Sequence, residues 1–396
     1  MQQLPRRLQS IDIFRAVTMF FMIFVNDVDG VKNIPEWIKH VDEYTDGLGF
    51  ADTIFPAFLF IVGLSIPFAL NKRIQSGESK KIIAWHIILR SLALIVMGFF
   101  HVNLENYNRD EALLPAPVWE ILITLAFFFI WLDYKPSISK TKQYFLQAAG
   151  VIILIVMAIL YRGDGHDDKD TWMRPHWWGI LGLIGWAYLT CALVYLFSNG
   201  RLKALFPVLI FFLIYTTLNQ TYILEPLSGI LRYCWPLNGG SEVSLIMSGI
   251  IISVIYRQTT NNNSRNFFVI MFIAAIVMIG FGFIIRPFGG ISKIHGTPSW
   301  VGICTGISII VFTLLIYWVD VKSKANWFNI IKPAGTSTLT CYLIPYFLYS
   351  FLVLLKIKYP VFLSEGIGGI LRSFAIAFIV IFITGWLEKK NLRLKI

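Results

Sequence analysis

The chain has 396 residues, of which 56% are hydrophobic and only 14% are charged, and its formal net charge is +11. Soluble domains carry about a quarter charged residues, so this composition excludes an ordinary soluble enzyme and favours an all-α membrane protein. Basic clusters beside apolar segments usually face anionic headgroups. We therefore interpret the excess of Lys and Arg as a sign of contact with membrane lipid and of topology, not of nucleic-acid binding.

Apolar stretches of about 17–22 residues, the length that a helix needs to cross a bilayer core, recur along the whole chain. They predict twelve membrane-spanning helices, near residues 11–26, 50–70, 82–101, 117–133, 144–161, 176–197, 204–220, 242–256, 266–285, 299–318, 334–355 and 367–386.

The distribution of basic residues predicts the orientation of these helices. Lys and Arg are concentrated in loops on the side of the N-terminus, such as 71–81, and in the tail after 386. The positive-inside rule then places both termini in the cytoplasm. The first apolar stretch lacks a small-residue cleavage site, so we expect it to remain as the first helix. The chain is thus predicted to be a multi-pass protein of the inner (cytoplasmic) membrane.

The first predicted span has polar residues at both ends. Asp12 and Arg15 are three residues apart, so they share a helix face and can pair. They form either a structural ion pair or an inner mouth at which Arg15 holds an anionic group such as phosphate. Asn26 follows about 16 Å further along the helix axis. It is either a helix-end cap or a donor to a developing oxyanion.

The loop 27–49 is too polar for an idle connection, and the next span opens with a carboxylate, Asp52. An ionisable group at a membrane boundary indicates a functional site. His40 lies between Asn26 and Asp52, where a neutral imidazole could take a proton from an incoming amine or hydroxyl while a carboxylate orients it. The alternative is an inert histidine of an outer loop.

Other charged residues within spans suggest binding sites. His86 and Arg90 are one turn apart in the third span, and an unpaired charge at mid-membrane costs at least about 2.5–3.5 kcal/mol. Arg90 is therefore either part of a buried structural pair or an anchor for an anionic ligand. Glu120 and Arg372 lie near the outer ends of their spans, so the same choice between a structural pair and a binding role applies to them less strongly.

The cysteines Cys191, Cys234, Cys304 and Cys341 are scattered and show neither metal-ligand spacing nor a disulfide framework. We expect no metal. We find no convincing internal repeat, which weakens a transporter interpretation without excluding it.

The N-terminal part of the chain resembles the heparan-α-glucosaminide N-acetyltransferase family and its bacterial relatives. The resemblance rests on the order and spacing of Ser10-Ile11-Asp12-Ile13-Phe14-Arg15, Phe24-Val25-Asn26, Lys39-His40, Asp46-Gly47-Leu48, Ala51-Asp52…Phe55-Pro56-Ala57-Phe58…Gly63-Leu64-Ser65-Ile66 and Arg90-Ser91. Looser similarity follows around Gly335-Thr336-Ser337-Thr338 and in the basic tail. Ala16 stands where the family usually has Gly, and the spans at 176–220 look like an additional helix pair.

The resemblance implies one transmembrane acyltransferase domain over 1–396, with the catalytic core helices in 1–133 and a possible homodimer. It implies transfer of an acetyl group from cytosolic acetyl-CoA to glucosamine or a related amino sugar on the periplasmic side. His40 takes the place of the essential histidine, as general base or transient acetyl carrier, with Asn26 and Asp52 as neighbours.

With this scheme, the residues themselves suggest where each substrate binds. Basic residues of the inner face would hold the phosphates of coenzyme A, namely Arg15, Lys72, Arg73, Arg257 and, along the passage, Arg90. Carboxylates would attract the cationic amino sugar, namely Asp27, Asp29, Asp46 and Glu120. Two alternatives remain open: an O-acyltransferase acting on envelope glycans or lipids, and a sugar transporter without chemistry.

Overall fold

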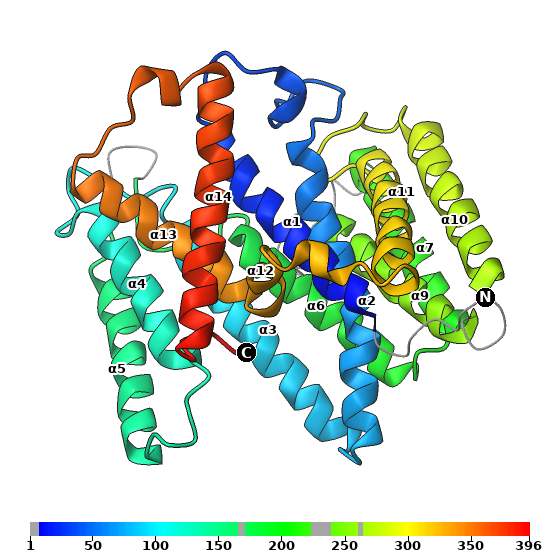
Figure 1. Ribbon diagram of the computed structural model, residues 1–396, viewed down its shortest axis with the longest axis horizontal. Helices are drawn as coiled ribbons and strands as arrows, with labels where there is room; N and C mark the ends of the chain where they lie inside the picture. Colours follow the sequence, from blue (N-terminus) through cyan, green and yellow to red (C-terminus); the bar gives the residue numbers. More distant parts are fainter. Residues whose placement is uncertain (1–7, 165–170, 222, 224–238, 260–263) are drawn as a thin grey trace.

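The computed structural model describes residues 8–164, 171–221, 223, 239–259 and 264–396. Every predicted span contains a helix (Figure 1), and the described residues form no strand beyond isolated bridges. The main helices of the predicted spans, within the described residues, are α1 (Gln9–Val28), α2 (Ala51–Gln75), α3 (Lys80–Val102), α4 (Ala116–Trp131), α5 (Lys140–Ile159), α6 (Gly179–Phe197), α7 (Leu202–Gln220), α9 (Ser241–Thr259), α10 (Ser264–Ile285), α11 (Pro298–Leu315), α13 (Thr338–Leu354) and α14 (Gly366–Lys389).

Eight helices in the described part of the chain are long and apolar enough to cross a membrane. They are α2, α3, α5, α6, α7, α10, α11 together with its π-helical extension η3 (Ile316–Val321), and α14. Helices α4 and α13 are apolar but shorter, and α1 and α9 carry charged residues. The all-α membrane fold is thus confirmed, whereas the count of twelve spans and the cytoplasmic termini stay predictions.

The eleventh predicted span is not one continuous helix. It is divided into α12 (Lys332–Thr336) and α13 by Ser337, whose φ of −127° and ψ of 48° are not helical. Gly335 lies so close to α1 that an added Cβ would meet the carbonyl oxygen of Asp12 at 2.3 Å. The chain therefore approaches α1 as a short helix, and the residues around the break, 335–338, line a cavity that is described below.

Close packing between α2 and α9 depends on a pair of glycines. A Cβ on Gly63 would lie 2.0 Å from the carbonyl oxygen of Ile246, and one on Gly249 would lie 2.1 Å from that of Phe60. Small residues let helix backbones approach closely in membranes. This contact fixes α2, whose first turn carries Asp52, against α9.

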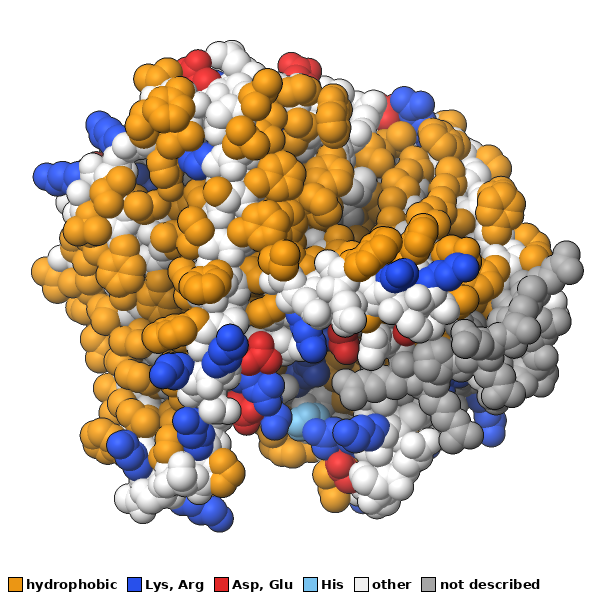
Figure 2. All heavy atoms as spheres, in the orientation of Figure 1, with side chains coloured by type: hydrophobic (Ala, Val, Ile, Leu, Met, Phe, Trp, Pro, Cys, Tyr) orange, Lys and Arg blue, Asp and Glu red, His pale blue; other side chains and the backbone are white. Residues whose placement is uncertain are grey.

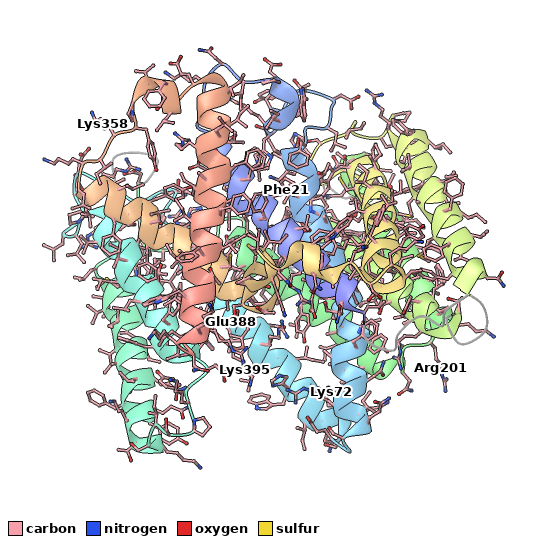
Figure 3. The ribbon with its side chains drawn as sticks, viewed as in Figure 1. Phe21, Lys72, Arg201, Lys358, Glu388 and Lys395 are labelled. Atoms are coloured by element: carbon pink, nitrogen blue, oxygen red, sulfur yellow. The ribbon has the colours of Figure 1, made fainter. Side chains whose placement is uncertain are left out.

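The two ends of the bundle differ in character. Figure 3 places Lys72, Arg201 and Lys395 at one end, which we call the Lys72 end, and Lys358 at the opposite end. The connection between α1 and α2, which contains η1 (Glu36–Ile38) and His40, lies at that opposite end, here called the loop end. Apolar side chains cover most of the face between them (Figure 2), as expected of a lipid-facing surface.

Candidate functional site

His40 and Asp52 are in direct contact at the loop end. The Nδ1 atom of His40 lies 2.7 Å from Oδ1 of Asp52, and the side chains are 30% and 3% exposed. The other carboxylate oxygen accepts hydrogen bonds from the backbone N–H groups of Val41 and Gly49, both at 3.1 Å. Asp52 thus orients the imidazole through Nδ1, and the same carboxylate anchors the loop.

The loop conformation that presents His40 depends on Gly49. A Cβ at this position would lie 2.1 Å from the carbonyl oxygen of Lys39. The backbone N–H of Phe50 also donates to the carbonyl of Trp37 at 2.7 Å. The residues on both sides of His40 are therefore held against the first turn of α2.

Sequence analysis missed Lys293, which contacts His40 from the connection between α10 and α11. Its Nζ lies 3.3 Å from Nδ1 and 3.4 Å from Nε2 of the imidazole. The connection is held by Asp46, which accepts a hydrogen bond from the backbone N–H of Ile291 at 2.7 Å and pairs with Arg286 at 2.9 Å. That hydrogen bond, with Arg286, lowers the pKa of Asp46. No local motif marks Lys293, because only the fold brings the two loops together.

Asn26 and Glu120 line a cavity of about 220 Å³ between α1, α4 and α13. Its other walls are Met19, Met22, Ile23 and the tyrosines and proline of α13, namely Tyr342, Pro345, Tyr346 and Tyr349. Glu120 accepts a hydrogen bond from the hydroxyl of Ser350. The side chain of Asn26 makes no hydrogen bond with any described residue and is free to bind a ligand.

Asp27 does not line this cavity and forms part of a buried polar cluster. One of its oxygens accepts from the hydroxyl of Tyr349 at 2.7 Å, and the other from Ser373 at 2.6 Å and from Arg372 at 3.0 Å. Its side chain is 3% exposed, so its acceptor capacity is already used within the protein. Asp29, by contrast, is exposed at the loop end.

A larger cavity, of about 380 Å³, lies toward the Lys72 end and is lined by three basic residues from separate elements, Arg15, Arg90 and Lys395. Arg15 contacts Asp12 at 3.2 Å, as the sequence predicts, and also donates to Ser65 at 2.7 Å and to the carbonyl of Gly335. Arg90 lies over the ring of Tyr188, 5.1 Å from its centroid. These cations make this end of the cavity suitable for an anionic group.

The remaining predicted basic residues line neither cavity in the described structure. Arg73 is engaged by Glu78 at 2.9 Å and by Nε2 of His86 at 2.8 Å, so His86 contacts Arg73 and not Arg90. Lys72 and Arg257 are exposed at the ends of α2 and α9. Figure 2 shows Lys and Arg side chains around a hollow at the lower edge of the molecule, between the ends of α5 and of α2 and α3.

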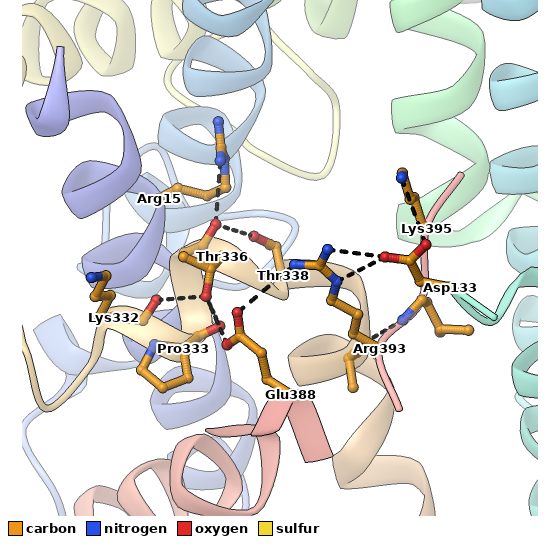
Figure 4. A network of polar contacts seen from close by, with 12 residues as sticks. Arg15, Asp133, Lys332, Pro333, Thr336, Thr338, Glu388, Arg393 and Lys395 are labelled. Carbon is orange, nitrogen blue, oxygen red and sulfur yellow. Dashed lines mark hydrogen bonds and ion pairs between the residues drawn. The ribbon is translucent and has the colours of Figure 1, made fainter. Parts of the chain in front are cut away.

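Lys395 is the second residue that sequence analysis missed, since the basic tail gave no sign of folding back into the bundle. Figure 4 shows how this tail is held: Arg393 pairs with Asp133 at 2.9 Å, and Lys395 lies 3.6 Å from the same carboxylate. Beside it, Thr336 of α12 donates to Glu388 of α14 at 2.9 Å. The network brings Lys395 to the wall of the larger cavity.

The two cavities adjoin, because Met19, Met22 and Tyr342 line both. Arg15, Met19, Met22 and Asn26 recur every three or four residues and thus share one face of α1. This face runs from the basic cavity to Asn26. Within the described part of the chain, His40 lines neither cavity and lies beyond them at the loop end. The described residues contain no group of three or more His, Cys, Asp or Glu placed to hold a metal ion.

Many apolar, exposed helices in an all-helical bundle define a multi-pass membrane protein, and two adjoining cavities lie in its interior. A family described as "Domain of unknown function (DUF5009)" matches residues 7–221, which is more than half of the chain, and the chain belongs to this family.

The chain is also similar to two curated proteins, and these matches confirm the resemblance recognised in the sequence. It is 38% identical over 126 residues to heparan-alpha-glucosaminide N-acetyltransferase of Homo sapiens. The aligned residues cover 31% of this chain and 18% of the relative. It is 34% identical over 149 residues to the protein of the same name from Mus musculus. Here the aligned residues cover 35% of this chain and 22% of that relative. The chain thus spans about a fifth of the length of these relatives.

Proposed function

We propose that this protein is a transmembrane acetyltransferase that transfers the acetyl group of acetyl-CoA to the amine of glucosamine or a related amino sugar. The observation that carries the proposal is the face of α1 that lines both cavities, from Arg15 to Asn26. It provides a continuous wall between a basic binding site at one end and a polar site near the other. The partial similarity to N-acetyltransferases supports the reaction type.

Acetyl-CoA fits the chemistry of the larger cavity. Its phosphates are anionic and would be held by Arg15, Arg90 and Lys395, since guanidinium and ammonium groups bind phosphate oxygens strongly. Its pantetheine arm is narrow and would extend along Met19 and Met22 toward Asn26. Because Lys72, Arg73 and Arg257 lie outside the cavity lining, they would contribute to the electrostatic potential of this end and not to direct contacts.

His40 and Asp52 supply the acid–base chemistry in this proposal. Either the acceptor amine attacks the thioester directly while Nε2 of His40 takes its proton, or His40 first accepts the acetyl group and then passes it to the amine. Asn26 would donate a hydrogen bond to the oxyanion. Both routes require the acetyl group to pass beyond Asn26 to the loop end, because a base must come within hydrogen-bond distance of the proton it removes.

The acceptor would bind at the loop end, where Glu120 lines the smaller cavity and Asp29 is exposed. Asp46 and Asp27 would act indirectly, by holding the loop of Lys293 and the end of α1. A homodimer and location in the inner membrane remain predictions from the sequence.

The decisive experiment uses sealed vesicles of known orientation, loaded with acetyl-CoA and supplied with glucosamine on the other side. We expect acetylated glucosamine only when acetyl-CoA is on the side of the Lys72 end. His40→Ala should abolish the product, whereas His295→Ala should not, since His295 is a half-exposed histidine of the same end. Glucosamine flux without acetylation would support a transporter, and acetylation of glucose as readily as of glucosamine would support an O-acyltransferase.

A single-turnover experiment separates the two routes. With labelled acetyl-CoA and no acceptor, a transient acetyl carrier would leave one labelled peptide, containing residue 40, and His40→Ala would remove the label. Direct transfer predicts no labelled protein under the same conditions.

A further inference from the structure

The ammonium group of Lys293 lies almost equally far from both ring nitrogens of His40, at 3.3 and 3.4 Å. Asp52 contacts the same imidazole at 2.7 Å through Nδ1. The ring therefore lies between a carboxylate from α2 and a cation from the connection between α10 and α11.

The contact is built into the fold, because the loop that carries Lys293 is fixed on both sides. On the N-terminal side, the backbone N–H of Ile291 donates to the side-chain carboxylate of Asp46, and the carbonyl of Ile291 accepts from the backbone N–H of Gly47. On the C-terminal side, the backbone N–H of Ser292 donates to the hydroxyl of Thr297 at 3.0 Å, directly before α11. Lys293 is thus half-buried at a defined position and differs from the flexible lysines of the surface.

The carboxylates that act on Lys293 are those of Asp52 and Asp29. Burial lowers the pKa of Lys293, while the carboxylates of Asp52 and Asp29 act in the opposite direction. His40 completes this group. Glu43 and His295 form a separate contact at 3.8 Å in the same region.

We propose that Lys293 is a positioning residue for the reaction of His40, an inference that rests on the proposed function. In the transfer step the acceptor nitrogen bonds to the acetyl carbon, the C–S bond breaks, and the acceptor proton moves to His40. The adjacent ammonium group opposes retention of that proton, so His40 passes it to the departing thiolate of coenzyme A. Asp52 meanwhile holds the ring through Nδ1. Asp52 therefore orients the imidazole, and Lys293 promotes release of its proton.

The first test does not depend on acetyltransferase activity. Diethyl pyrocarbonate modifies the unprotonated imidazole, and peptide mass spectrometry reports the rate of modification at His40 as a function of pH. Lys293→Met removes the cation, so the midpoint of this profile should move upward by about one pH unit or more, as expected for a charge within about 4 Å. Lys293→Arg retains the charge and should stay near the wild-type profile. Lys32→Met, at an exposed lysine of the loop that carries His40, should have no effect.

Lys293→Gln separates charge from packing, since it keeps a hydrogen-bond donor and loses only the charge. It should shift the profile as Lys293→Met does. If both neutral variants, folded, kept the wild-type midpoint, Lys293 would not be coupled to His40 and the inference would be wrong.

The second test is activity in the vesicle assay. The neutral variants should lower kcat at least tenfold with little change in KM for acetyl-CoA, and Lys293→Arg should recover a large part of kcat. A wild-type protein that transfers no acetyl group, together with a shifted modification profile, would reject the proposed function and leave the coupling standing. An active wild type with unchanged kcat in both neutral variants would reject the role of Lys293 alone.

Discussion

Removal of the charge of Asp27 should reveal whether this residue holds the bundle together or binds substrate. Asp27→Asn keeps the size of the side chain and leaves the guanidinium of Arg372, whose side chain is 12% exposed, without its carboxylate. Loss of one member of a buried ion pair typically costs about 3–5 kcal/mol. We expect the lower end of this range, because Arg372 also lies over the ring of Tyr359, 4.6 Å from its centroid, and that contact would remain.

The assay is thermal unfolding of the purified protein in detergent, with Asp27→Asn, Arg372→Met and the double variant. If the pair interacts, the double variant should be less destabilised than the sum of the single variants. Glu36→Gln, at an exposed carboxylate of the loop end, is the matched control and should leave the melting temperature unchanged. A change in melting temperature below about 1 °C for Asp27→Asn, accompanied by a raised KM for the amino sugar, would refute the structural role and favour substrate binding.

Other predictions concern the two ends of the site. Gly49→Ala should abolish activity while the bundle remains folded, because the added Cβ would meet the carbonyl of Lys39 at 2.1 Å; activity and circular dichroism check this. A hydrogen bond from a backbone N–H of the opposing loop lowers the pKa of Asp46. The contribution of the Asp46 carboxylate to the stability of the fold is therefore complete above the ordinary Asp pKa of about 3.9 and is lost as pH falls through the lowered value. Asp46→Asn should therefore speed amide hydrogen exchange in the connection between α10 and α11 at pH 7. The increase should be less than about tenfold, because the ion pair of Asp46 is exposed. Equal exchange rates in the wild type and the variant would contradict this. Lys395→Met should weaken acetyl-CoA binding about tenfold, the usual value of a charged hydrogen bond, whereas Lys358→Met at the opposite end should not, as isothermal titration can show.

The sequence predicts the helices well because the length of an apolar run determines whether it can cross a membrane. It also brings Asp12 to Arg15 and suggests His40 beside Asp52, and both contacts are present at 3.2 and 2.7 Å. The first contact follows from helix periodicity, and the second from a short loop that joins the two residues. Their roles in catalysis remain predictions.

The rest of the site could not be predicted because it is assembled from distant segments. Lys293 meets His40 only after two loops pair through Asp46, and Lys395 reaches the larger cavity only through the ion pairs of the folded tail. The break at Ser337 was missed for a different reason. An apolar run shows that a segment prefers the membrane but not whether the close approach of Gly335 to α1 interrupts its helix.

The geometry of α1 shows why one helix can take part in binding at one end and in chemistry at the other. A helix advances 1.5 Å per residue, so the eleven residues from Arg15 to Asn26 span about 16 Å, roughly half of a bilayer core of about 30 Å. In the proposed function, an extended pantetheine arm along this face would need no large movement of the protein to carry its thioester from the basic cavity to Asn26. The side chains of Met19 and Met22, which lie between Arg15 and Asn26 on this face, are apolar. The remaining distance to His40 lies at the loop end, where the loops held by Asp52 and Asp46 meet. In the proposed function, the order of these loops would determine whether the acetyl group can reach His40.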